Sequence, residues 1–269
     1  MERLLIVEKL EKRYERTRAF EAKQVVAALQ GVSLSIAQGS TLALVGESGS
    51  GKSTLGFCIA GLERPTSGSI VFNGSEITAL DEKQLRVVRP QIQLVFQDPA
   101  RSLNPRFSAL EIVSEPLLVQ GHLDNPEREA RARVLLAQVG IPQEKALQKA
   151  DEFSGGQKQR LAIARALALK PKLLILDEAL SALDCSVQAQ IANLLMELQA
   201  SLGLTYLFIT HDFAIAGHLA DEIAVMEQGK LVELGAADKV LRAPGQEVTR
   251  RLIAATPRLT AEALAPRAI

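Results

Sequence analysis

The octapeptide GESGSGKS, from Gly46 to Ser53, constrains the fold of this chain more than any other feature. It follows the aliphatic run Leu42–Val45, which reads as a strand, and it runs into Lys52–Ala60, which reads as a helix. A glycine-rich turn in this position points backbone amides inward, and the helix N-terminus adds partial positive charge. The sequence therefore predicts an α/β fold built around a phosphate-binding loop.

We call residues 46–53 the phosphate loop, and its spacing is that of a loop that binds a nucleoside triphosphate. Lys52 would reach the β- and γ-phosphate oxygens, and the Ser53 hydroxyl would bind Mg²⁺. A glycine-rich turn without a ligand is the alternative, which the flanking strand and helix disfavour. The residues expected to contact ATP here are Gly46, Glu47, Ser48, Gly49, Ser50, Gly51, Lys52, Ser53 and Thr54.

Two adjacent carboxylates end another aliphatic run, LLILDE, from Leu173 to Glu178. Asp177 would help to hold hydrated Mg²⁺, and Glu178 would polarise an attacking water as a general base. A solvated strand end is the alternative interpretation. The phosphate loop in the same chain favours the catalytic one.

The segment FSGGQKQR, from Phe153 to Arg160, offers a second anion site. Ser154, Gly155 and Gly156 would leave amides and a hydroxyl exposed at the start of a helix that continues to Lys170-Pro171. One loop already satisfies a triphosphate. The second site is therefore expected to serve a nucleotide held by another subunit.

These segments together resemble the nucleotide-binding subunit of an ATP-binding cassette (ABC) transporter over nearly the whole chain. In that family the phosphate loop is the Walker A motif, LLILDE is Walker B and SGGQ is the signature. Three further positions match the family in order: Gln97 at the Q-loop glutamine, Asp184 in the D-loop sequence SALD, and His211 at the switch histidine.

The resemblance implies a head-to-tail dimer in which each ATP is held by the phosphate loop of one subunit and by Ser154–Gln157 of the other. Glu178, His211 and Gln97 would be the catalytic residues, with His211 contacting the γ-phosphate and Gln97 linking it to a helical subdomain. Asp184 would also bind the nucleotide. The metal ligands would be Ser53, Gln97 and Asp177.

An aromatic residue after the first strand usually stacks on adenine in this family. Tyr14 is the best-placed aromatic residue here, and Phe20 is its competitor. Stacking would contribute about 1 kcal/mol to binding.

The expected fold is a P-loop NTPase core with a mostly parallel sheet, an antiparallel β subdomain and an inserted helical subdomain. We expect an ATPase domain at 1–243, with the helical subdomain at about 105–165, and a C-terminal extension at 244–269 containing two short helical pieces. A helix is expected at 186–200. Short strands are expected at 4–7, 32–36, 42–45, 69–72, 92–96, 173–176 and 205–209, with a strand pair at 221–234 that turns at Gly229.

Three segments resemble the branch of the family that serves oligopeptide, dipeptide and nickel importers. They are FQDPARSLNPR (96–106), SVQAQI (186–191) and TRRLIAATP (249–257). The chain departs from the usual pattern in reading DEALSALD for DEPTSALD, in having Phe153 for leucine, and in lacking the His and Tyr usual in the stretch APGQEVTR (243–250). None of these departures removes a residue expected to touch ATP.

The resemblance also implies partners and a location. The partners would be a second ABC ATPase subunit, more often a related chain than an identical one, transmembrane permease subunits, and indirectly an extracytoplasmic solute-binding protein. The chain would be peripheral, on the cytoplasmic face of the bacterial inner (plasma) membrane. The N-terminus has no signal-peptide core, and polar residues and glycines interrupt the charge-free stretch 24–46, so no membrane span is expected.

Charge and cysteine usage narrow the alternatives. Lys plus Arg and Asp plus Glu both number 31, so no broad basic surface for nucleic acid is expected. The two cysteines predict neither a disulfide scaffold nor a zinc site. The ATPase subunit of an exporter remains an alternative, because importers and exporters of this family share the same ATPase domain. A soluble ABC protein acting on nucleic acid is another alternative. A P-loop kinase or GTPase would leave SGGQ unexplained.

Overall fold

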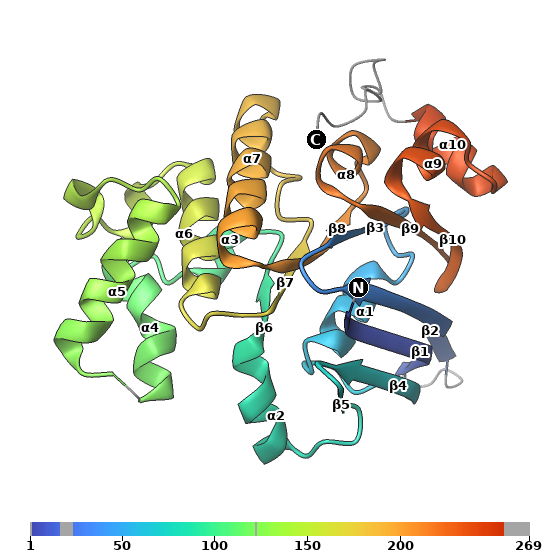
Figure 1. The fold of residues 1–269 in the computed structure, drawn as a ribbon, viewed down its shortest axis with the longest axis horizontal. Helices are drawn as coiled ribbons and strands as arrows, with labels where there is room; N and C mark the ends of the chain where they lie inside the picture. Colours follow the sequence, from blue (N-terminus) through green and yellow to red (C-terminus); the bar gives the residue numbers. More distant parts are fainter. Residues whose placement is uncertain (1, 17–23, 122, 256–269) are drawn as a thin grey trace. The chain divides into compact units, whose positions relative to one another are not determined.

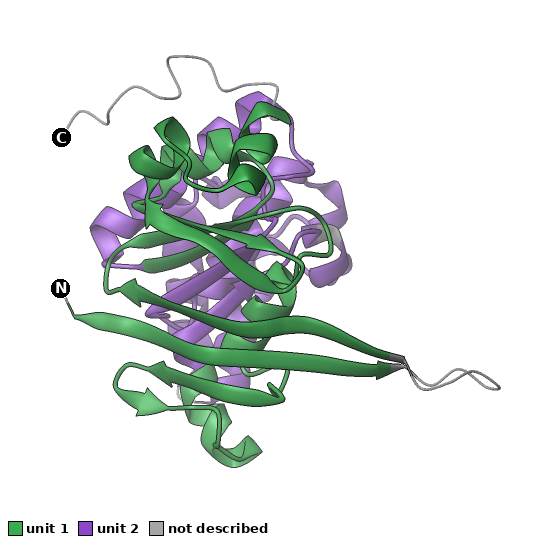
Figure 2. Cartoon of the chain, turned by 90° about the vertical axis from the view of Figure 1, so that its right-hand side faces the viewer, with its two compact units in different colours: residues 1–89, 205–269 green, residues 90–204 purple. Residues whose placement is uncertain are grey.

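The computed structural model describes residues 2–16, 24–121 and 123–255. The chain forms two compact units, coloured separately in Figure 2. The first comprises Met1–Arg89 and Thr205–Ile269, and the second comprises Pro90–Leu204.

An antiparallel sheet occupies the N-terminal part of the first unit (Figure 2). Strand β1 (Arg3–Arg16) pairs with β2 (Gln24–Ala37) and with β4 (Ser67–Phe72), which pairs with β5 (Ser75–Glu76). The strands expected at 4–7 and 32–36 are therefore far too short, because β1 and β2 are 14 residues each. Charged residues on the exposed face of a strand do not end it, since alternate side chains point to opposite faces.

The other strands of the first unit carry the phosphate loop. Strand β3 (Thr41–Val45) lies between β8 (Thr205–Thr210) and β9 (Glu222–Glu227) and is parallel to both, while β10 (Lys230–Ala236) pairs antiparallel with β9. Every residue of β3 and β8 is buried, as expected for strands covered on both faces. The helices are α1 (Lys52–Ile59), α2 (Glu82–Val88), α8 (Phe213–Leu219), α9 (Ala237–Arg242) and α10 (Glu247–Ala255).

The second unit contains two parallel strands, β6 (Ile92–Val95) and β7 (Leu173–Asp177), and a group of helices. The helices are α3 (Pro99–Ser102), α4 (Ala109–Gln120), α5 (Asn125–Gln138), α6 (Gly155–Leu167) and α7 (Cys185–Leu202), with short 3₁₀ turns at Gln143–Lys145 and Ala150–Glu152. Helices α4, α5 and α6 pack against one another (Figure 1). Each of these three begins with a capping box, in which the side chains of the capping residue and of the third helical residue bond each other's backbone amides.

Parallel strands, an antiparallel sheet and a helical region confirm the predicted α/β class. The helix expected at 186–200 and the strand pair turning at Gly229 are also confirmed. One helical piece expected in the C-terminal extension is α10, whereas residues 256–269, where a second piece could lie, are outside the described residues. The expected domain boundaries stay predictions. In the described ranges no helix has the length and apolar character needed to cross a bilayer.

Candidate functional site

The phosphate loop joins β3 to α1 and is packed so closely that two positions admit only glycine. A Cβ on Gly46 would lie 2.3 Å from the Met226 carbonyl oxygen at the end of β9. A Cβ on Gly51 would lie 2.4 Å from the Ala28 carbonyl oxygen of β2, and Gly51 also has φ +102°. Gly46 is thus required by packing, whereas Gly49 and Gly51 have the positive φ that the turn needs.

Lys52 holds its ammonium group inside the loop. The residue is only 4% exposed, and Nζ donates hydrogen bonds to the carbonyl oxygens of Gly46 (2.8 Å) and Glu47 (2.7 Å). The third contact, to the Ser50 Oγ, is longer at 3.4 Å. An ammonium group with three donors can exchange these bonds for phosphate oxygens without moving far. The arrangement therefore presents a positive charge where a triphosphate would bind.

His211 leaves the sheet beside the phosphate loop. Parallel strands β3 and β8 pair with Val45 opposite Thr210, so Gly46 and His211 follow neighbouring strand ends at the same edge. The next residue, Asp212, caps α8 by accepting hydrogen bonds from the backbone amides of Ala214 (2.7 Å) and Ile215 (3.3 Å). The structure therefore brings His211 to the edge where ligands bind in α/β sheets.

Tyr14 lies on β1 directly opposite Val26 of β2 and is half-buried. The Lys12 Nζ sits 4.8 Å from the centroid of its ring, which is cation–π geometry. Ala28, two residues from Val26, is the residue whose carbonyl abuts Gly51. Tyr14 thus belongs to the strand pair that borders the loop, and adenine stacking stays a prediction. The competing Phe20 lies outside the described residues.

In the second unit, Gln97 and Glu178 come together. Parallel strands β6 and β7 pair with Val95 opposite Leu176, so both side chains follow the same sheet edge. Gln97 Nε2 donates a hydrogen bond to Glu178 Oε2 at 3.0 Å. The two predicted catalytic residues, 81 positions apart in sequence, are therefore in direct contact.

Glu178 also adopts a backbone conformation that the sequence did not indicate. Its φ is +46°, in the left-handed region, which costs a residue with a side chain about 1–2 kcal/mol. Its carbonyl oxygen accepts hydrogen bonds from the backbone amide (3.1 Å) and the hydroxyl (2.9 Å) of Ser181. These two bonds hold the backbone of Glu178, which follows buried Asp177, in this conformation.

The signature segment begins α6 as expected, with Ser154 as its N-cap. Ser154 Oγ accepts a hydrogen bond from the Gln157 amide (3.4 Å), and Gln157 Oε1 accepts one from the Ser154 amide (3.1 Å). Ser154 and Gly155 are exposed. This helix end can therefore meet an anion from outside the unit.

Gly156 has a packing role that sequence reasoning missed. A Cβ there would lie 2.5 Å from Val187 Cγ1 of α7, whereas a Cβ on Gly155 would meet Leu183 Cδ2 at an ordinary 3.6 Å. Asp184 caps α7 by accepting a hydrogen bond from the Val187 amide at 3.0 Å. The signature and D-loop positions therefore lie side by side because two helix starts pack against each other.

The expected metal ligands fit Mg²⁺ by their chemistry. The Ser53 hydroxyl, the Asp177 carboxylate and the Gln97 amide oxygen are hard oxygen donors, and Gln97 uses its nitrogen, not its oxygen, to contact Glu178. Among the described residues there is no group of three or more His, Cys, Asp and Glu able to hold a metal alone. Mg²⁺ in nucleotide sites characteristically takes most ligands from phosphates and water.

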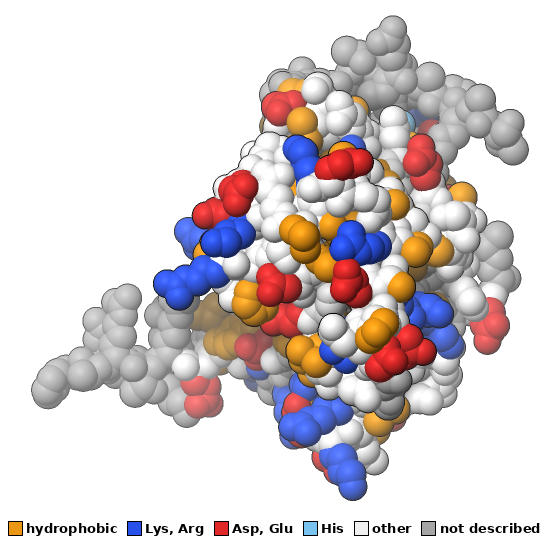
Figure 3. Space-filling view, turned by 90° about the vertical axis from the view of Figure 1, so that its left-hand side faces the viewer, with side chains coloured by type: hydrophobic (Ala, Val, Ile, Leu, Met, Phe, Trp, Pro, Cys, Tyr) orange, Lys and Arg blue, Asp and Glu red, His pale blue; other side chains and the backbone are white. Residues whose placement is uncertain are grey.

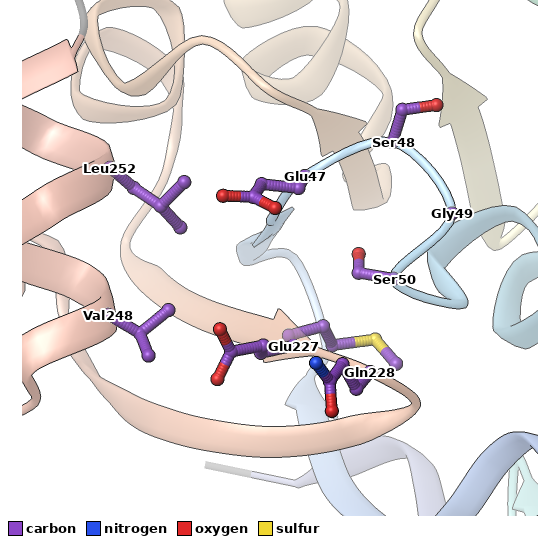
Figure 4. Close-up of a pocket in the computed structure, with 9 residues that line it drawn as sticks. Glu47, Ser48, Gly49, Ser50, Glu227, Gln228, Val248 and Leu252 are labelled. Atoms are coloured by element: carbon purple, nitrogen blue, oxygen red, sulfur yellow. The ribbon is translucent and has the colours of Figure 1, made fainter.

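A small pocket lies beside the phosphate loop, and sequence reasoning did not foresee it. Figure 4 shows Val248 and Leu252 projecting from α10 toward Glu47 of the loop and Glu227 at the end of β9. The neighbouring residue on α10, Arg251, contacts both carboxylates. The C-terminal extension therefore reaches the loop, although its sequence indicated only a family branch.

Comparisons with known proteins agree on one family. The family model described as "ABC transporter" matches residues 29–181. The dipeptide transport ATP-binding protein DppF of Escherichia coli (strain K12) is 45% identical over 240 residues, which cover 89% of this chain and 72% of DppF. The di/tripeptide transport ATP-binding protein DppF of Pseudomonas aeruginosa (strain UCBPP-PA14) is 42% identical over 268 residues, which cover 99% of this chain and 83% of that protein.

Solved structures show the same fold. The dimeric structure of MJ0796, a bacterial ABC transporter cassette, matches with a TM-score of 0.77 at 32% identity, covering 87% of this chain and 98% of that one. The structure of cbiO1 from Clostridium perfringens, part of the ABC transporter complex cbiONQ, matches with a TM-score of 0.79 at 32% identity. It covers 96% of this chain and 97% of that one.

Proposed function

The chain belongs to the ABC transporter family, as its motifs predicted, and on this premise we propose that it is the ATP-hydrolysing subunit of an importer of peptides. The observation that carries the proposal is the phosphate loop, with Lys52 held inside it and His211 leaving the adjacent strand. The names of the dipeptide and di/tripeptide relatives support peptides as the transported class.

In the proposed reaction, water attacks the γ-phosphorus of ATP, the bond to the β-γ bridging oxygen breaks, and ADP and phosphate leave. Glu178 takes the proton of the attacking water, and Lys52 with the loop amides stabilises the negative charge on the phosphates. His211 contacts the γ-phosphate. Bound Mg²⁺ would neutralise phosphate charge, held by Ser53, Asp177 and Gln97.

Gln97 has two tasks in this proposal. Its amide nitrogen donates to Glu178, which restrains the direction of the carboxylate. Its amide oxygen is the group that would turn to the metal. The contact with Glu178 makes Gln97 the side chain through which the helical part of the second unit can respond to nucleotide.

We further propose a head-to-tail dimer with a second ABC ATPase subunit, most readily a related but different chain. Ser154, Gly155, Gly156 and Gln157 would meet the nucleotide held by the phosphate loop of that subunit, with Asp184 beside them. The exposure of Ser154 and Gly155 at a capped helix start supports this. The dimeric form of the related cassette supports it too.

Transmembrane permease subunits are the proposed mechanical partners, with an extracytoplasmic solute-binding protein acting through them. Figure 3 shows apolar side chains spread among charged ones on one face of the molecule. The strongly exposed large apolar side chains of helices α4 and α5 and the segment after α5 are Leu118, Val119, Val134 and Leu147. They support contact with another protein here. We propose that the chain is peripheral, on the cytoplasmic face of the inner membrane.

The test is Glu178→Gln in the assembled transporter, assayed for ATP hydrolysis and peptide uptake into vesicles. Removal of the general base should lower hydrolysis about 10²-fold or more. The matched control is Glu197→Gln, the same change at an exposed position of α7 in the same unit, which should leave hydrolysis intact. Unchanged hydrolysis in Glu178→Gln would remove Glu178 from this role, and ATP-independent peptide uptake would refute the importer assignment.

A further inference from the structure

Helix α10 of the C-terminal extension is tied to the phosphate loop by one guanidinium group. Arg251 Nη2 lies 3.4 Å from Glu47 Oε1 and 3.2 Å from Glu227 Oε1. Glu47 is the second residue of the loop, and Glu227 is the last residue of β9. Arg251 thus joins three segments, although Glu47 lies 204 positions away in sequence.

The helix that carries Arg251 is anchored at its start. Glu233 of β10 accepts hydrogen bonds from the backbone amides of Gly245 (2.8 Å) and Gln246 (3.2 Å), just before α10 begins. Burial raises the pKa of the Glu233 carboxyl, but the nearby Thr249 side chain, the two amide hydrogen bonds and the positive charge of Arg250 together lower the pKa below its usual value. The ionised carboxylate is therefore a stable cap that fixes α10 against β10.

The loop is also held from the side of the β9–β10 turn. The Gly229 amide donates a hydrogen bond to the Ser50 carbonyl oxygen at 2.9 Å, and Gly46 is packed against Met226. Between this turn, the loop and α10 lies the pocket of Figure 4, about 100 Å³, which Val248 and Leu252 line with apolar surface. Arg251 precedes Leu252 on α10 and contacts Glu47 and Glu227, two of the residues that line this pocket.

The charges of Arg251, Glu47 and Glu227 affect how the phosphate loop binds an anion. Glu47 belongs to the phosphate loop, and Glu227 lies beside it. Their negative charges repel the negatively charged phosphates that the loop must bind. The guanidinium of Arg251 offsets that repulsion and restrains the Glu47 side chain. Both carboxylates and Arg251 are exposed or half-exposed, so the effect is modest and is screened by salt.

We infer that Arg251 is a positioning residue for nucleotide binding, which sets the ATP affinity of the phosphate loop by holding and neutralising Glu47. The inference rests on the proposed function, in which this loop binds ATP. It assigns a task to the C-terminal segment that the family motifs leave without one.

The experiment is equilibrium binding of ATP without Mg²⁺ to the full chain, for the unsubstituted protein and for Arg251→Met, at about 0.1 M and about 1 M ionic strength. Methionine keeps much of the stem but removes the charge. An exposed ion pair is weak, so Kd for ATP should rise about 1.5- to fivefold at the lower ionic strength. The difference should shrink toward none at the higher one, where the screening length is about 3 Å.

Two further variants isolate the cause. Arg242→Ala removes the same charge from α9, where the arginine pairs with Asp238, and should leave Kd unchanged. In a Glu47→Gln background, Arg251→Met should have a clearly smaller effect, because the two side chains act through each other. An effect that is equal at both ionic strengths, or one that persists in full in the Glu47→Gln background, would overturn the inference.

A Lys52→Ala variant separates this inference from the proposed function. If the chain binds ATP, Lys52→Ala abolishes binding and Arg251→Met changes nothing, the inference alone fails. If ATP does not bind, or Lys52→Ala binds it as well as the unsubstituted chain, the proposed function fails as well.

Discussion

Gly156 offers the sharpest test of how the signature segment is built. An alanine there would place Cβ 2.5 Å from Val187 Cγ1, about 1 Å closer than ordinary contact. Val187 is β-branched, so its side chain has few rotamers with which to retreat. Overpacking of this kind costs about 1–3 kcal/mol, against which alanine regains up to about 1 kcal/mol of helix propensity over glycine. Gly156→Ala should therefore be about 1–3 kcal/mol less stable than a variant that gains the same methyl group without a clash.

The assay is thermal unfolding of Gly156→Ala, with Gly155→Ala as the matched control. A shift of about 2–4 °C per kcal/mol applies to domains of this size. Gly155→Ala should be neutral or slightly stabilising, because its Cβ meets Leu183 Cδ2 at 3.6 Å. Equal melting temperatures for the two variants would refute the steric argument, since they differ only in what the added methyl group meets.

Adding Val187→Ala to Gly156→Ala removes the clash and distinguishes packing from ligand contact. The double variant should recover most of the stability that Gly156→Ala loses. Its stability should exceed the value expected from adding the separate effects of Gly156→Ala and Val187→Ala. If ATP hydrolysis in the assembled transporter recovers with it, Gly156 serves packing. If stability recovers and hydrolysis does not, the Cβ also blocks the approach of the partner's nucleotide.

Two other predictions follow from single contacts. Arg165 of α6 donates a hydrogen bond from Nη1 to the Ser102 carbonyl oxygen at 2.6 Å, and its guanidinium is largely withdrawn from water. Arg165→Met should therefore lower the free energy of unfolding by about 1–3 kcal/mol, measured by thermal unfolding. An unchanged melting temperature would refute the importance of this bond. The pKa of Glu233 lies below its ordinary value of 4.5, so its stabilisation of α10 should be complete above about pH 4.5 and lost as pH falls through the lower folded value. Hydrogen exchange of α10 amides should show this loss below pH 4.5, and Glu233→Gln should remove the pH dependence.

Local pattern was sufficient for two buried strands and for one capped helix start, whereas the capped helix α2 was not predicted at all. The all-aliphatic runs of β3 and β7 and the Ser154 cap of α6 were predicted within a residue or two. The lengths of the paired strands β1 and β2 were not predicted, because each strand continues as long as the other offers it a partner. In β1 the buried side changes from odd to even positions, since Val7 and Leu10 are both buried and the pairing register shifts between them, so the sequence shows no continuous alternation.

The parts of the site that escaped prediction depend on distant packing. The left-handed φ of Glu178 is stabilised by the hydrogen bond from the Ser181 hydroxyl to the Glu178 carbonyl oxygen, which no sequence motif predicts. The reason for glycine at 156 is Val187, on another helix. The contact between Arg251 and Glu47 joins segments that are 204 positions apart in sequence. Residue types indicated which atoms could do chemistry, whereas only the fold shows which atoms restrain them.

Parallel strand register is what makes neighbours of residues that are far apart in sequence. Gly46 and His211 follow Val45 and Thr210, which are paired, and Gln97 and Glu178 follow strands paired at Val95 and Leu176. A slip of one residue would move the strand end by about 3.3 Å and turn its side chains to the other face. Such a slip in β7 would carry Glu178 out of reach of Gln97, because the displacement is as large as the 3.0 Å between the two bonded atoms. The buried aliphatic side chains that set this register therefore determine the catalytic geometry without touching a ligand.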